Sequence, residues 1–324
     1  MRRLLTLFLL STIAAATADP TPSLRIDPAR ITVSGKSAGG YMAHQLHVAY
    51  SDLFSGAGII AGGPFGCAQG SVATAVTRCM ASTGGELSPT EFVDEIKESA
   101  GKGLVADTKN LADDRVWLFH SPLDRVVAES LSDTLLGVYR AFLPADRIVY
   151  VNDVPAEHLP TRGSGKTCDA SGLVTGNCDY DAAGQLLQQL YPGLETPAGM
   201  APASLGKVEL PGAASAGLQE TALLYVPAAC SADGKACALH LVLHGCVQSS
   251  AQVGTAFIEQ SGYLPWAEAN GIVLAFPQVA VSAVNPLACW DWWGYTGRDY
   301  RWRNGAQMKL LADWMRQLAG IGSP

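Results

Sequence analysis

The sequence predicts an α/β fold in which helices cover both faces of a mostly parallel sheet. Short apolar segments alternate with helical ones along the 324-residue chain, and this alternation is typical of such a sheet. Polar residues gather just after the predicted strands, where the carboxyl ends of parallel strands form the usual binding edge. The third observation is Gly35-Lys36-Ser37-Ala38-Gly39, a G-x-S-x-G match placed between a strand and a helix, which marks a nucleophilic serine on a sharp turn.

The predicted strands are short apolar runs bounded by turn residues. We expect them at 29–35, 54–64, 115–119, 146–151, 220–227, 237–246 and 271–278. The predicted helices carry apolar residues at helical spacing. We expect them at 38–50, 133–143, 182–191, 256–270 and 305–319, with a cysteine-tied loop and a polar helical stretch within 67–114.

The composition and the first residues indicate an exported globular protein. Apolar residues make up 48% and charged residues 16% of the chain, and the formal charge of -7 argues against nucleic acid as a partner. Arg2 and Arg3 precede an apolar stretch too short for a bilayer, followed by a small-residue cleavage site at 16–18. We expect a signal peptide at 1–18 (a buried N-terminal helix is the alternative), one catalytic domain at 19–324, secretion, no membrane partner and a monomer.

Eight cysteines suit an oxidising compartment and suggest four disulfides. Three pairs are local in the sequence, and the fourth pair is what remains. The expected bridges are Cys67–Cys79, Cys168–Cys178, Cys230–Cys237 and Cys246–Cys289. A zinc site is the alternative, but the chain has no C-x-x-C and no histidine at finger spacing, so we expect no metal and no cofactor.

The element that ordinarily precedes the nucleophile lies about two hundred residues after it. Residues 239–246 look like the strand and His-Gly turn that supply the oxyanion hole in α/β-hydrolases. Termini of a compact domain are often adjacent, so a permuted order costs little. The simplest interpretation is a circularly permuted α/β-hydrolase, in which residues 220–280 complete the sheet that residues 29–155 begin.

A serine hydroxyl needs a base, and the base needs a carboxylate that fixes its tautomer. We predict His158 as the base because it lies in a loop after a strand, between Pro155 and Pro160. The other histidines fit less well, since each lies on a helix, inside a strand, ahead of the acid or in the oxyanion turn. These are His44, His47, His120, His240 and His244.

For the acid we predict Asp124, which follows the 115–119 strand after a short loop, where this fold places a triad acid. Asp113 and Asp114 precede that strand, and Asp153 lies only five residues before His158. The oxyanion needs two backbone N–H donors. We expect them from Ala38 and Cys246, with a Cys246–Cys289 bridge holding the second donor rigid.

The segment 289–297 carries three tryptophans and a tyrosine within six residues. One interpretation is a buried plug beneath a loop, because large aromatic side chains dominate cores. The other is an aromatic wall beside the active site that grips an apolar substrate. We predict Trp290, Trp293 and Tyr295 as substrate-binding residues.

Four segments, 34–68, 224–249, 257–278 and 289–297, closely resemble extracellular poly(3-hydroxybutyrate) depolymerases of the single-domain, circularly permuted type. The resemblance covers nearly all of the mature chain. It implies a triad at Ser37, Asp124 and His158, oxyanion donors at Ala38 and Cys246, and substrate-binding aromatics within 289–297. Some relatives have tryptophan at the position of Tyr295.

The hypothesis is a secreted serine esterase that hydrolyses poly(3-hydroxybutyrate) or its oligomers through an acyl-enzyme. We expect no separate polymer-binding domain after Pro324, so adsorption would use the catalytic domain itself, or the substrate would be a soluble oligomer. One alternative is an esterase for feruloyl or aryl esters or synthetic polyesters. Another, of a different class, is a non-catalytic polymer-binding protein.

Overall fold

A computed structural model describes residues 24–83, 85, 87–158, 166–167, 176–199, 205–230 and 235–322. The predicted signal peptide at 1–18 lies outside the described residues, and so does Cys168. Within the described ranges, no helix is long and apolar enough to cross a membrane.

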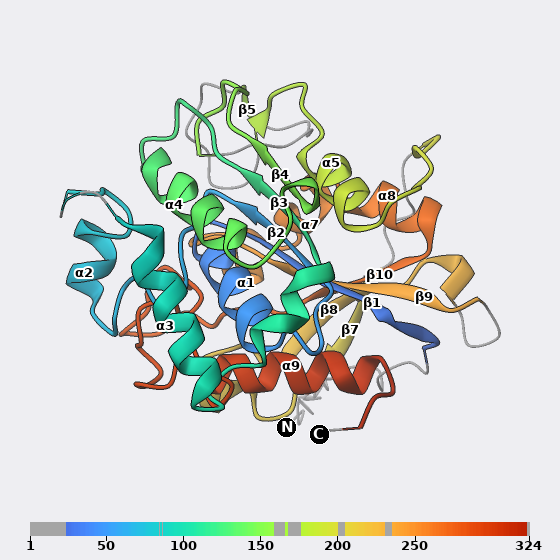
Figure 1. The fold of residues 1–324 in the computed structure, drawn as a ribbon. Coiled ribbons are helices and arrows are strands. Elements are labelled where there is room, and N and C mark those ends of the chain that lie inside the picture. Colours follow the sequence, from blue (N-terminus) through green and yellow to red (C-terminus); the bar gives the residue numbers. More distant parts are fainter. Residues whose placement is uncertain are drawn as a thin grey trace, which may run out of the picture.

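An eight-stranded sheet runs through the molecule in the order β4-β3-β2-β1-β9-β10-β8-β7 (Figure 1). Neighbours from β4 to β10 are parallel, whereas β8 pairs antiparallel with both β10 and β7. Its strands are β1 (Ile26–Lys36), β2 (Gly56–Ile60), β3 (Arg115–Phe119), β4 (Ile148–Val151), β7 (Leu205–Glu209), β8 (Thr221–Tyr225), β9 (Cys237–Leu243) and β10 (Ile272–Phe276). A separate parallel pair is formed by β5 (Lys166–Thr167) and β6 (Gly176–Asn177).

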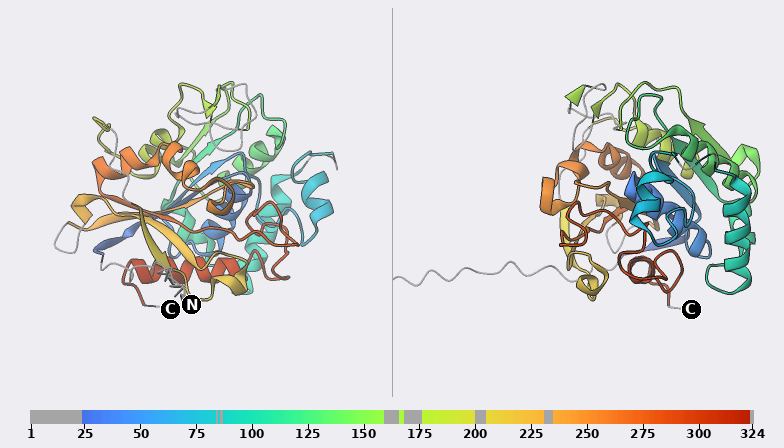
Figure 2. Two further views of the ribbon diagram at one scale, coloured as in Figure 1. Left: turned by 180° about the vertical axis from the view of Figure 1, so that it is seen from behind. Right: turned by 90° about the vertical axis from the view of Figure 1, so that its left-hand side faces the viewer.

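The α-helices of the described ranges are α1 (Ala38–Ala49), α2 (Val72–Thr77), α3 (Pro89–Gly101), α4 (Glu129–Arg140), α5 (Ala182–Leu190), α6 (Ser250–Val253), α7 (Ala256–Gln260), α8 (Tyr263–Asn270) and α9 (Ala306–Leu318). Short 3-10 helices are η1 (Thr108–Asp113), η2 (Ala145–Arg147), η3 (Ala213–Ala216) and η4 (Ala228–Cys230). Seen from behind, α9 in red and α7 and α8 in orange lie on opposite sides of the sheet (Figure 2).

The sheet separates two apolar cores because successive side chains of a strand point to opposite faces. One core gathers Ile31 and Val33 of β1 with side chains of α1, α3, α4 and α9. The other gathers Phe119 of β3 and Phe276 of β10 with side chains of α5, α7 and α8. Both faces are therefore covered, as predicted, and the central strands are buried along most of their length.

Strand β9 lies beside β1, with Leu243 opposite Gly35 in a parallel register. The prediction that residues 220–280 complete the sheet begun by 29–155 is thereby confirmed, since β8, β9 and β10 all belong to it. Parallel strands in this register end at the same edge. The turn after Leu243 and the turn at Ser37 are consequently neighbours, although they lie far apart in the sequence.

One predicted helix differs from the structure, and one strand of the sheet was not predicted. The helix expected at 256–270 is two helices, because the chain breaks at Gly262, whose φ of 88° lies in the left-handed region that favours glycine. Strand β7 was not predicted at all. It is an edge strand with mostly exposed or half-exposed residues, so it lacks the apolar run by which the other strands are recognised.

Three of the predicted disulfides are confirmed. Cys67–Cys79, Cys230–Cys237 and Cys246–Cys289 are bonded, with Cα atoms 6.0, 5.9 and 4.3 Å apart. Cys178 is also disulfide-bonded, and its predicted partner Cys168 lies outside the described residues. The Cys246–Cys289 bridge joins the turn after β9 to the aromatic segment 289–297, as expected.

The close contact between α1 and the end of β9 predicts a position where a single methyl group matters. A Cβ added at Gly39 would lie 2.4 Å from the Leu243 carbonyl oxygen and 2.5 Å from that of His244. Gly39→Ala should therefore push α1 away from β9 and lower the free energy of unfolding by about 1–3 kcal/mol, as overpacking does. Gly101→Ala is the matched control, because a Cβ at that helical glycine meets nothing within 4 Å. Equal urea midpoints for the two variants would contradict this.

Candidate active site

Ser37 occupies the turn between β1 and α1 in a strained backbone conformation, with φ 55° and ψ -121°. Such conformations cost about 1–3 kcal/mol and persist only where the surroundings impose them. Here the Ser37 N–H donates to the Ile60 carbonyl at 2.8 Å. A Cβ at Gly35 would lie 2.1 Å from the Gly39 carbonyl oxygen, so only glycine permits the chain to fold back this sharply. The local geometry is that of a nucleophile elbow.

His158 and Asp124 are paired in the loops that follow β4 and β3. His158 Nδ1 lies 2.6 Å from Asp124 Oδ2, and the carboxylate side chain is 1% exposed. The other carboxylate oxygen, Oδ1, accepts the N–H groups of Val126 and Val127 at 2.8 and 3.0 Å. The acid is thus fixed by backbone, and it holds His158 with Nδ1 toward the carboxylate. This leaves Nε2 as the nitrogen available to a nucleophile.

The charges of the pair follow from their surroundings. Burial alone would raise the pKa of Asp124, but the hydrogen bonds from His158 and the two amides outweigh burial and lower it. The pKa of His158 is also lowered, by burial first and by the Lys36 charge second, although Asp124 opposes both. A neutral imidazole beside an ionised carboxylate is the state a general base requires.

Ser37, His158 and Cys246 line one pocket of about 510 Å³ at the carboxyl edge of the sheet. The remaining walls are almost entirely aliphatic or aromatic. They include Val72, Val76, Val126, Val284, Leu287, Trp292 and Trp293. The structure therefore brings the predicted nucleophile, base and second oxyanion donor together around an apolar space, and it places Lys36 there as well.

Hydrogen bonds and a disulfide hold the turn 244–246 in place. The Gly245 N–H donates to Gln248 Oε1 at 2.9 Å, and the Val247 N–H donates to the Leu287 carbonyl at 2.7 Å. Among the described hydrogen bonds, the Cys246 N–H has no acceptor. Cys246 also lines the pocket, so its N–H is available there to an acceptor on a ligand, as the predicted role of second oxyanion donor requires. Ala38, the first residue of α1, carries an N–H that has no intrahelical acceptor.

His244 belongs to the scaffold of this turn. Its Nδ1–H donates to the Gly245 carbonyl at 2.7 Å, and its Nε2 accepts the Val279 N–H at 3.2 Å. Burial lowers the pKa of His244 to about 4. Both ring nitrogens are occupied and the ring is neutral, so His244 supports the turn and has no nitrogen free to act as a base.

The other four histidines also sit in buried scaffolds. His240 bridges Thr32 and Ser34, and His47 contacts Asp114 and Tyr139, so neither has a free nitrogen. His44 Nδ1 lies 3.3 Å from the Gly63 carbonyl oxygen, and His120 Nδ1 lies 2.9 Å from Ser132 Oγ. None of the four lines the pocket.

The aromatic segment 289–297 is divided between the buried core and the wall of the pocket. The prediction that Trp290 binds substrate is wrong, because this side chain belongs to the core. Trp290 is 0% exposed, and its Nε1–H donates to the His244 carbonyl at 2.9 Å, so it supports the turn from beneath. Tyr295 is not among the pocket-lining residues. Its hydroxyl donates to the Cys289 carbonyl at 2.9 Å. Trp293, which was predicted to bind substrate, lines the pocket. Trp292, which was not predicted, lines it too and stacks on Tyr41, with the ring centroids 4.2 Å apart.

The aliphatic part of the wall was also missed. Val72 and Val76 lie four residues apart on α2, within the loop closed by Cys67–Cys79. Their spacing places both on one helix face, and this was the signal available in the sequence. Both side chains are more than half exposed, which distinguishes them from core residues.

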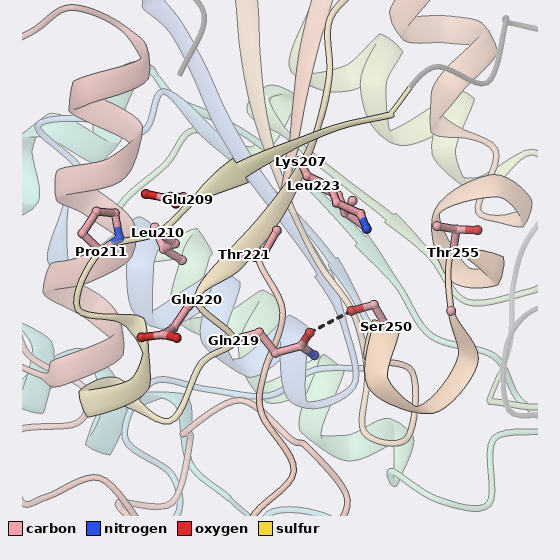
Figure 3. Close-up of a pocket in the computed structure, with 11 residues that line it drawn as sticks. Lys207, Glu209, Leu210, Pro211, Gln219, Glu220, Thr221, Leu223, Ser250 and Thr255 are labelled. Carbon is pink, nitrogen blue, oxygen red and sulfur yellow. Dashed lines mark hydrogen bonds between the residues drawn. The ribbon is translucent and has the colours of Figure 1, made fainter. Parts of the chain in front are cut away.

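A second, larger cavity of about 750 Å³ lies between β7, β8 and α6 (Figure 3). Its lining is mixed. It includes the polar and charged side chains of Lys207, Glu209, Glu220 and Ser250, and Ser250 Oγ donates to Gln219 Oε1 at 3.1 Å. It contains no histidine and none of the predicted catalytic residues. It is the larger of the two cavities, but the predicted nucleophile Ser37 and the predicted base His158 both line the smaller one.

No family model matches the chain, but individual proteins do. The poly(3-hydroxybutyrate) depolymerase of Delftia acidovorans is 41% identical over 297 residues, which is 90% of this chain and only 60% of that protein's length. The polyhydroxybutyrate depolymerase of Talaromyces funiculosus is 32% identical over 324 residues, covering 94% of each chain.

The fold of this chain is also similar to solved structures of PHB depolymerases. The crystal structure of PHB depolymerase from Penicillium funiculosum has a TM-score of 0.85 at 31% identity and covers 93% of this chain and 99% of that one. A serine-to-alanine variant of a PHB depolymerase complexed with an R3HB trimer has a TM-score of 0.86 with the same identity and coverage. The chain belongs to the poly(3-hydroxybutyrate) depolymerase family of carboxylic ester hydrolases.

Proposed function

We propose that this chain is a secreted serine esterase that hydrolyses poly(3-hydroxybutyrate) or its oligomers. The observation that carries the proposal is the His158–Asp124 pair at 2.6 Å, which shares one apolar pocket with Ser37 on its strained turn. The similarity to a depolymerase that holds an R3HB trimer supports the same substrate class. Esterases for feruloyl, aryl or synthetic polyester substrates use the same chemistry, so they are the alternatives to test.

In the proposed mechanism Ser37 Oγ attacks the ester carbonyl carbon while His158 Nε2 accepts the hydroxyl proton. Asp124 keeps the imidazole oriented and stabilises its cation. The N–H groups of Ala38 and Cys246 stabilise the oxyanion. His158 then protonates the leaving alcohol, and the acyl-enzyme is hydrolysed by water with His158 again as base.

An apolar rim around the pocket supports a polyester substrate. Five of the eight exposed large aliphatic side chains in the described ranges line the pocket, namely Val72, Val76, Val126, Val284 and Leu287. An exposed apolar patch of this kind marks an interaction surface. Each Å² of apolar surface covered by a polymer contributes about 25 cal/mol, and it does so without demanding directional contacts.

We propose that the chain is a circularly permuted α/β-hydrolase that is exported from the cell. The position of β9 beside β1 supports a circularly permuted α/β-hydrolase, since the oxyanion strand follows the nucleophile in sequence yet adjoins it in the sheet. We propose one catalytic domain over 19–324, acting as a monomer. The disulfides and the signal-like segment at 1–18 support export.

Removing the nucleophile is the first test. Ser37→Ala should abolish hydrolysis of a polyhydroxybutyrate suspension and of soluble aryl esters, and it should block labelling by a fluorophosphonate. Asp124→Asn should lower kcat by about ten-thousandfold, because the wrong imidazole tautomer is then favoured. Unchanged melting temperatures provide the control. Full activity in Asp124→Asn would show that another carboxylate is the acid, and a wild-type protein that resists the probe would indicate a binding module.

The pH dependence tests the base. His158 must be neutral to accept the proton, and its pKa in the folded protein lies below the ordinary value of 6.5. The value of kcat/KM should therefore be fully developed at pH 7 and fall as the pH is lowered through this pKa, with a midpoint below pH 6.5. Circular dichroism at each pH controls for unfolding. A midpoint clearly above 6.5 would exclude the proposed environment of His158.

The divided aromatic segment gives a matched pair of variants. Trp293→Ala removes part of the pocket wall, so it should reduce polymer hydrolysis severalfold more than hydrolysis of a very small soluble ester. Trp290→Ala instead opens a cavity beneath the turn. It should lower the free energy of unfolding by about 3–5 kcal/mol and impair all substrates alike. If the two variants lost the same free energy of unfolding and the same activity on polymer and small ester, the division of these rings into wall and core would be refuted.

A further inference from the structure

Lys36 is a charged side chain inside the apolar pocket. It ends β1 directly before Ser37, it is 8% exposed, and it lines the pocket with His158. Residues two and four positions earlier, Ser34 and Thr32, point to the same face of the strand and are bound by His240. The Lys36 ammonium, in contrast, has no hydrogen bond and no ion pair among the described residues.

An ammonium without a partner is unfavourable in a largely apolar pocket, because lysine is rarely buried unless it is paired. The carboxylate that acts on Lys36 is Asp124, but both oxygens of Asp124 are already bound by His158 and two amides. Burial lowers the pKa of Lys36 to about 8, with Asp124 opposing the effect. At neutral pH the pocket therefore holds a cation whose hydrogen-bond donors point at no described acceptor.

This arrangement suits a ligand that carries its own anion. We propose that the Lys36 ammonium binds the free carboxylate at the end of a short 3-hydroxyacyl oligomer, and that the pocket thereby selects chain ends over the neutral interior of the polymer. The inference rests on the proposed esterase function. In such an oligomer the terminal carboxylate carbon is three bonds from the ester oxygen expelled by the attack of Ser37. A cation on the residue adjoining the nucleophile is within reach of that group.

The alternative roles of Lys36 fit the geometry less well. Lys36 is not needed as a base, because His158 already lies in the pocket and is paired with the carboxylate of Asp124. It is not a structural ion pair either, since the described residues offer it no bonded carboxylate. A substrate carboxylate would satisfy its charge and donors together, and charge-assisted hydrogen bonds of this kind are the strong ones.

The test compares two forms of one substrate, the 3-hydroxybutyrate trimer as the free acid and as its methyl ester. The readout is the ratio of kcat/KM for the acid to kcat/KM for the ester. Lys36→Met keeps the length of the side chain and removes the charge, so this ratio should fall about tenfold to hundredfold. Lys207→Met is the matched control, because Lys207 lines the other cavity, and it should leave the ratio at the wild-type value.

A measurement on the wild-type enzyme covers the case in which Lys36→Met does not fold. Hydrolysis of a neutral aryl ester should be inhibited at lower concentration by 3-hydroxybutanoate than by methyl 3-hydroxybutanoate. The carboxylate site would be overturned if 3-hydroxybutanoate inhibited no better than its methyl ester. It would also be overturned if a folded Lys36→Met variant kept the wild-type ratio of kcat/KM for the acid and the ester. Neither result would affect the proposed esterase function. If the wild-type enzyme cleaves neither form of the trimer, the proposed function itself fails.

Discussion

The site depends on the close approach of three backbones at one point. The chain turns at Ser37 with φ 55°, Gly35 touches the first turn of α1, and Gly39 of that turn touches the end of β9. Only residues without a Cβ allow this spacing, and the strain at Ser37 is offset by the hydrogen bonds and packing of the surrounding sheet. Because of the same contact, Ser37 and the turn 244–246 lie side by side.

The proposed second oxyanion donor, the Cys246 N–H, is held by a scaffold that differs from that of Ser37. The turn 244–246 is fixed from below by the Trp290 N–H, from the side by the Cys246–Cys289 bridge, and internally by His244. Trp290, His244 and Cys289 are buried, and Cys246 is half-buried. A donor held this way does not have to reorganise as charge develops on the substrate oxygen, and this is the usual origin of oxyanion stabilisation. The residue that the sequence suggested as a substrate contact, Trp290, contributes here instead.

What could be predicted from sequence followed from local physical rules. Strand β3 lies at 115–119 as expected because it is a short apolar run with clear boundaries, and the pairing of His158 with Asp124 followed from the polar residues after two adjacent strands. Strand β7 could not be found, since an exposed edge strand carries no apolar signal. Neither could the division between Trp290 and Trp293, because composition does not reveal which ring faces the core. That depends on tertiary contacts with the turn after β9.

A single charge in an otherwise apolar pocket has consequences for selectivity. Apolar contact discriminates weakly, since a methylene more or less changes binding by only about 1–3 kcal/mol, and every repeat of a polyester presents the same surface. A cation beside the nucleophile distinguishes the one repeat that bears a carboxylate from all the others. It also acts on the base, because the Lys36 charge lowers the pKa of His158. A bound carboxylate would cancel that effect, so recognition of the chain end and the basicity of the catalytic imidazole would be coupled through the same side chain.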